Sequence, residues 1–138
     1  MNAKIIAVAN QKGGVAKTTS VRNMAFSLGE QGKKVLALDF DPQSNLTSSF
    51  ADEATKITNT IAEIMYKAMD EEQLPYPEEY IYTHGNVDFI PSSIHLSVVE
   101  ANLRMEMGSE KLLANILEPL RKDYDYILID TNPSLGPL

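Results

Sequence analysis

The stretch with the clearest chemical content lies near the start of the chain, where NQKGGVAKTTS follows the apolar run IIAVA directly. Its adjacent glycines, Gly13 and Gly14, can adopt backbone angles that are closed to other residues, so successive N–H groups can point toward one place. A helix that begins there adds partial positive charge, and Lys17 adds a full one. These residues predict a loop that holds a chain of phosphates.

The side chains after the glycines fit the same chemistry. Lys17 can reach the β- and γ-phosphates, the hydroxyl of Thr18 can complete the shell of a Mg²⁺ ion, and Thr19 is placed to donate to an earlier phosphate. The usual order of Gly, four residues, Gly, Lys and Ser or Thr is broken, because Gln11 and Ala16 stand at the two glycine positions. Ala16 is tolerable if its backbone is near-helical with negative φ, since it then adds only a Cβ.

Acidic residues follow two apolar runs that read as strands. Asp39 and Asp41 lie in LDFDPQSN, and Asp130 ends ILID. Ligands of α/β sheets bind at the carboxyl ends of the strands, so we predict a metal site made by Thr18, Asp41 and Asp130. Asp39 is equally well explained as a turn residue at the end of a strand, and both interpretations stay open.

The elements that must position these residues alternate along the chain. KIIAVA, residues 4–9, is apolar throughout, as is typical of a strand buried on both faces of a parallel sheet. A helix is predicted from Lys17 to about Gln31, with apolar residues on one face, and a second buried strand over 35–39. A right-handed crossover is expected to join the two parallel strands.

Further elements continue the alternation. Thr60 and Glu63 form a predicted capping box for a helix, and residues 86–91 read as a short strand. Ser92 or Ser93 is expected to cap the next helix, and Ser109 another. The final strand is YDYILID, residues 124–130. We therefore predict an α/β sandwich with a mainly parallel sheet, forming one domain over residues 1–138.

The composition of the chain excludes several kinds of functional site. The chain has 138 residues, no cysteine and a formal net charge of −7. Disulfides, thiolate-bound zinc and a catalytic thiol are excluded within it, and an extended basic face for nucleic acid is disfavoured. The apolar runs are far shorter than the ~20 residues that span a bilayer, so we expect a cytoplasmic protein without membrane association.

Three motifs carry a resemblance to a known family. KGGVAKTT resembles the deviant Walker A motif of the ParA/MinD family of ATPases, whose signature is Lys-Gly-Gly, two residues, then Lys-Thr. DFDPQSNLT is similar to the A′ box of ParA-type, Soj-like DNA-partitioning proteins, and PSSIHLSVVEANL and DYILIDTNPSLG resemble further segments of them. The resemblance covers most of the chain. It implies the three-layer α/β sandwich of P-loop NTPases, truncated at the C-terminus.

The resemblance also implies a mechanism. ATP and Mg²⁺ would bind to the loop residues Lys12, Gly13, Gly14, Val15, Ala16, Lys17, Thr18 and Thr19. Lys17 would act in catalysis, Asp41 would orient or activate the attacking water, and Lys12 would reach the nucleotide of a partner copy in an ATP-dependent homodimer. A ParB-like partner would stimulate hydrolysis, and DNA would bind without sequence preference through the missing C-terminal half, in chromosome or plasmid segregation.

Two alternatives remain open. A MinD-like positioning ATPase would need an amphipathic C-terminal helix for membrane association, and we expect none to follow TNPSLGPL. A non-enzymatic alternative treats the chain as a truncated fragment that binds nucleotide without turnover. An ATPase assay with and without DNA and Mg²⁺ separates these possibilities.

Overall fold

The sheet lies at the centre of the molecule. The computed structural model describes residues 2–9, 14–52, 55–106 and 109–131. Five strands pair in the order β1-β5-β2-β4-β3. Their bounds are β1 Lys4–Ala9, β2 Val35–Phe40, β3 Tyr82–His84, β4 Val87–Ile90 and β5 Tyr126–Thr131. All neighbouring pairs are parallel except β3 with β4, so the predicted mainly parallel sheet is confirmed.

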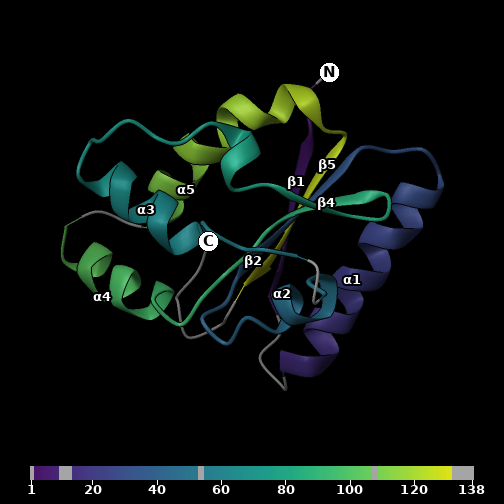
Figure 1. Cartoon of the computed structure of the whole chain (residues 1–138), viewed down its shortest axis with the longest axis horizontal. Coiled ribbons are helices and arrows are strands. Elements are labelled where there is room, and N and C mark those ends of the chain that lie inside the picture. Colours follow the sequence, from purple (N-terminus) through teal and green to yellow (C-terminus); the bar gives the residue numbers. More distant parts are fainter. Residues whose placement is uncertain (1, 10–13, 53–54, 107–108, 132–138) are drawn as a thin grey trace.

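Helices cover both faces of this sheet and make three layers (Figure 1). On one side lie α1 and α2, and on the other lie α3, α4 and α5. Their bounds are α1 Gly14–Glu30, α2 Asn45–Phe50, α3 Ile61–Met69, α4 Leu96–Glu106 and α5 Ser109–Leu117, and short 3₁₀ turns occupy Pro77–Glu79 and Glu118–Asp123. The predicted α/β sandwich is the observed architecture.

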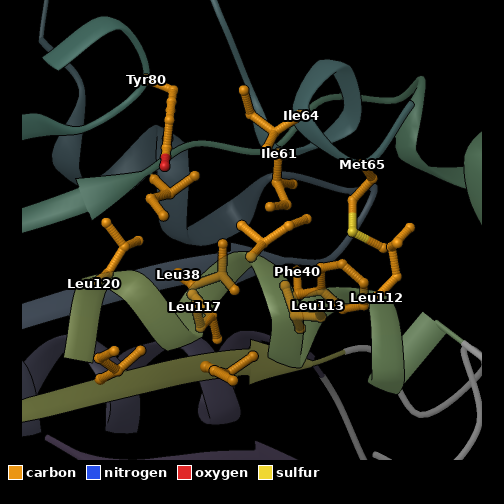
Figure 2. Close-up of a cluster of buried hydrophobic side chains, with 14 of the residues drawn as sticks. Leu38, Phe40, Ile61, Ile64, Met65, Tyr80, Leu112, Leu113, Leu117 and Leu120 are labelled. Atoms are coloured by element: carbon orange, nitrogen blue, oxygen red, sulfur yellow. The ribbon is translucent and has the colours of Figure 1, made fainter. Parts of the chain in front are cut away.

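Alternate residues of the central strands divide the core in two. Leu38 and Phe40 of β2 point toward α3 and α5, as Figure 2 shows. Val35 and Ala37 of the same strand belong to the second cluster, which includes Leu128 and buried residues of α1 and α2. Every residue of β2 is buried, because apolar layers cover both of its faces.

The strongest sequence patterns fold as predicted. β1 has its predicted bounds, and α3 begins with the capping box in which the Thr60 backbone N–H donates to Glu63 at 2.9 Å. α1 begins at Gly14, three residues before the predicted start, and Ala16 therefore lies within helical backbone. Gly32 adopts φ 84° just beyond the helix, a conformation that favours glycine and lets the chain turn into β2.

Other elements differ from the prediction. α4 begins at Leu96, so Ser92 and Ser93 precede it by several residues and do not cap it. Ser109 is the first residue of α5 rather than its cap. α2 and β3 were not predicted, because NLTSSF is short and mostly polar and β3 has only three residues. Gly85, at φ 60°, makes the tight turn between β3 and β4, and the Gly-Asn dipeptide there is a hairpin signal.

One edge of the sheet is open among the residues that the structure describes. There β1 pairs with β5 alone. Ile5 of β1 is 41% exposed, whereas its neighbour in the register, Ile127, is completely buried. An apolar edge strand with unpaired N–H and C=O groups is a template for pairing with another strand.

We expect residues 1–138, expressed alone, to self-associate through this edge. Ile5→Glu should reduce the association, because its charge would lie beside the apolar side chains of the added strand on one face of the sheet. Ile94→Glu is the matched control, since Ile94 is 64% exposed and lies outside the edge strand. Sedimentation velocity over a tenfold range of protein concentration measures the effect. Equal association of both variants and the parent chain would show that the β1 edge is not the contact.

Within the described ranges, none of the helices combines the length and apolar character that crossing a bilayer requires.

Candidate functional site

The carboxyl ends of the parallel strands bring the predicted site residues to one edge of the sheet. β5 lies between β1 and β2, with Asp130 beside Asp39 of β2 and Val8 of β1 in the register. α1 begins at the same edge, shortly after β1 ends. The backbone of Gly14, Val15, Ala16 and Lys17 forms the first turn of this helix. Lys12 and Gly13 lie outside the described residues.

Thr18 and Asp130 are in direct contact, although they are 112 residues apart in the sequence. The Thr18 hydroxyl donates to a carboxylate oxygen of Asp130 at 2.9 Å. Thr18 is 7% exposed and Asp130 is completely buried. The contact ties the first turns of α1 to the end of β5. Two of the three predicted metal ligands are therefore adjacent, whereas Thr19, one residue on, is exposed.

Asp41 lies at the same edge, in the turn that follows β2. It is buried, and one of its carboxylate oxygens accepts a hydrogen bond from the Gln43 backbone N–H at 2.9 Å. The Asp41 carbonyl accepts from the Ser44 backbone N–H at 2.9 Å. Ser44 adopts φ 60°, a left-handed conformation that is uncommon for serine. The Asp41 turn is thus tightly constrained.

The carboxylate of Asp39 accepts hydrogen bonds from other groups of the protein. It accepts from the Thr47 backbone N–H at 2.8 Å, from the Thr47 hydroxyl at 2.6 Å and from the Asp41 backbone N–H at 3.3 Å. Its pKa is raised to about 7, chiefly because burial disfavours the charged form. The hydrogen bonds from Thr47 lower this pKa, and the charges of Asp130 and Asp41 raise it. The structure therefore favours the interpretation of Asp39 as a strand-end residue.

The donor set suits a hard cation. Mg²⁺ is typically held by one or two carboxylates together with phosphate oxygens and waters, not by a complete protein cage. A hydroxyl and two carboxylates at one sheet edge fit that pattern. In the part of the chain that the structure describes, no group of three or more His, Asp or Glu side chains could hold a metal on its own.

Two residues of the site were not found from the sequence. Thr47 links Asp39 to Ser92. Its hydroxyl donates to Asp39 and accepts a hydrogen bond from the Ser92 backbone N–H at 2.8 Å. The Ser92 hydroxyl donates to the Asp41 carbonyl, also at 2.8 Å. Ser92 follows β4, and the only sequence signal was its place after a strand at the ligand-binding edge. It was predicted as a helix cap instead.

The chain is similar to a known protein family and to several known proteins. A family model described as an AAA domain matches residues 3–138. The sporulation initiation inhibitor protein Soj of Bacillus subtilis is 39% identical over 135 residues, which cover 98% of this chain and 52% of that protein. The chromosome partitioning protein ParA of Myxococcus xanthus is 38% identical over 135 residues, which cover 98% of this chain and 46% of that protein.

A solved structure shares the fold. The crystal structure of cobyrinic acid a,c-diamide synthase from Mycobacterium smegmatis, with bound ADP and magnesium, has a TM-score of 0.82 and 38% identity. The match covers 97% of this chain and 53% of that one. The chain thus spans about half the length of the relatives that it matches. It belongs to the AAA domain family and, within it, to the ParA/MinD group of P-loop NTPases.

Proposed function

We propose that this chain carries the ATP site of a ParA-like partition ATPase that hydrolyses ATP with Mg²⁺. The observation that carries the proposal is the contact between Thr18, in the helix that follows the phosphate loop, and the buried Asp130. A strand-end carboxylate paired with the hydroxyl after a loop lysine is the arrangement that a Mg²⁺-bound nucleotide needs. The solved relative with bound ADP and magnesium supports the choice of ligands.

Each residue has a role in this proposal. The amides of residues 12–19 and the side chain of Lys17 hold the phosphates, with Thr19 on an earlier phosphate. Thr18, Asp41 and Asp130 would hold the metal, Asp130 through water. The ion would supply positive charge that stabilises the phosphoryl group during transfer. Asp41 orients or activates the attacking water, so this chain contributes mainly positioning and electrostatic stabilisation.

The proposal extends to assembly and biological role. ATP closes a homodimer in which Lys12 of one copy reaches the nucleotide of the other. A ParB-like protein stimulates hydrolysis, and DNA binds without sequence preference through the half of the relatives' length that this chain does not span. The name of the Myxococcus xanthus relative supports a role in chromosome segregation, and we extend the proposal to plasmid segregation. We place the protein in the cytoplasm and away from membranes.

A steady-state ATPase assay, with and without Mg²⁺ and DNA, tests the proposal. It uses the 138-residue chain and the same sequence within a protein of the relatives' length. Turnover that requires Mg²⁺ in the longer protein supports a ParA-like ATPase. ATP binding without turnover in both would favour the alternative of a binding fragment. Absence of ATP binding in both would contradict the site itself.

Asp41→Ala should keep ATP bound and slow hydrolysis by about 10² or more, because a water-positioning group acts mainly in the transition state. Calorimetric titration gives the affinity, and single-turnover kinetics give the rate. Asp70→Ala is the matched control, since Asp70 is exposed at the end of α3. Unchanged turnover of the Asp41 variant in the longer protein would remove Asp41 from the mechanism.

A further inference from the structure

Four residues at the sheet edge form a closed ring of hydrogen bonds. The Asp39 carboxylate accepts from the Thr47 hydroxyl at 2.6 Å, and that hydroxyl accepts from the Ser92 backbone N–H at 2.8 Å. The Ser92 hydroxyl donates to the Asp41 carbonyl at 2.8 Å. The Asp41 backbone N–H donates to Asp39 at 3.3 Å and closes the ring.

This ring holds the backbone of Asp41 from both sides. Asp39 binds its N–H and Ser92 binds its C=O, so the peptide groups before and after the Asp41 Cα are both fixed. The side chain then bonds within its own turn, to the Gln43 N–H. A carboxylate that must orient a reactant benefits from such support, because a displacement of about 1 Å can cost about 10² in rate.

The ring joins β2 and the nearby helix α2 to a segment that is distant from both in the sequence. Asp39 lies near the end of β2, Thr47 lies in α2, and Ser92 follows β4. All four side chains are buried, so water cannot easily replace a lost partner. Ser92 makes two of the four bonds. A shift of the segment after β4 would therefore break the bond from Ser92 to the Thr47 hydroxyl and the bond from Ser92 to the Asp41 carbonyl.

We propose that Thr47 and Ser92 are positioning residues that hold Asp41 in its working geometry, with Asp39 as their anchor. The inference rests on the proposed function, since it assigns these residues to the hydrolytic step. It implies that the segment after β4 influences turnover through the hydrogen bonds of Ser92 to the Asp41 carbonyl and to Thr47. Thr47 and Ser92 therefore affect the rate of hydrolysis and leave ATP affinity nearly unchanged.

The test compares Thr47→Val, which has nearly the same shape but no hydroxyl, with Ser92→Ala. We expect kcat for ATP hydrolysis to fall roughly five- to twentyfold in each, as expected when a buried hydrogen bond is lost, with KM within about twofold. Thr47→Ser restores the hydroxyl and should recover most of kcat. Thr83→Val is the matched control, because Thr83 is exposed on β3 and its hydroxyl donates to the carboxylate of Asp88 on β4.

Amide hydrogen exchange in the 138-residue chain gives a readout that does not need turnover. Thr47→Val and Ser92→Ala should accelerate exchange of the Asp41 and Gln43 amides, while amides in β5 stay protected. Asp41→Ala provides the second check. Once the carboxylate is absent, adding Thr47→Val should lower kcat no further, because the two changes act through the same group.

Several results would overturn the inference. A thermal midpoint that falls in Thr47→Val while kcat stays at the parent value would make the ring purely structural. A full further loss of kcat on adding Thr47→Val to Asp41→Ala would show action independent of Asp41. A parent protein that exchanges as expected but never hydrolyses ATP would contradict the proposed function, and the positioning role would fall with it.

Discussion

Replacing Lys17 with alanine is expected to abolish detectable nucleotide binding. The backbone of Lys17 lies in the first turn of α1, at the edge where the strands end. Its side chain is the one loop charge aimed at the β- and γ-phosphates of the copy's own nucleotide in our proposal. Hydrogen bonds to ionised groups are about twice as strong as neutral ones, so we expect affinity to fall by roughly a hundredfold or more.

Isothermal titration with ATP and Mg²⁺ measures this change. Lys33→Ala is the matched control. Lys33 is exposed and precedes β2, so it lies at the amino ends of the parallel strands, opposite the site. It removes the same charge from the protein and should leave the affinity unaltered. Micromolar affinity retained by Lys17→Ala would contradict the phosphate-loop assignment, whereas an equal loss in both variants would indicate only a nonspecific effect of net charge.

The parts of the fold that were predictable are those with strong local signals. KIIAVA and VLALD are continuous apolar runs, as buried parallel strands require, and both form strands. The capping box of α3 is complete within four consecutive residues, so its physics is visible in the sequence. The place of Asp130 at the ligand-binding edge followed from the same reasoning, because it comes directly after the apolar run YILI, near the end of β5.

The missed parts depend on contacts between distant segments. Ser92 has the composition of a helix cap, but its N–H and hydroxyl are both used by Thr47 and Asp41, and α4 starts later. No local sequence pattern indicates that Ser92 bonds to Thr47 and Asp41 in place of capping a helix. α2 is likewise stabilised by burial of Leu46 and Phe50 against the sheet rather than by helix propensity, which is weak in six residues. Tertiary contacts therefore determine where α4 begins and that α2 forms.

The position of Lys12 leads to the prediction with the largest expected effect on rate. It lies outside the described residues, two positions before α1 begins at Gly14. One lysine and the loop amides suffice for a phosphate loop, so a second positive charge beside the glycines is not needed to close it. In our proposal it points along the dimer interface to the partner's nucleotide. A positive group supplied in trans in this way is worth about 10³ to 10⁵ in rate.

Lys12→Ala, in a protein of the relatives' length, should therefore still bind ATP as a monomer but lose ATP-dependent dimerisation, with hydrolysis reduced by about 10³ or more. Light scattering with and without ATP gives the oligomeric state, and titration gives the affinity. Lys122→Ala is the matched control, because Lys122 is exposed before β5, away from the site edge. If the Lys12 variant dimerises and turns over like this control, the trans role is wrong. If the Lys12 variant loses ATP binding as well, Lys12 contacts the nucleotide of its own copy, beside Lys17. The positive charge supplied in trans would then have to come from another residue.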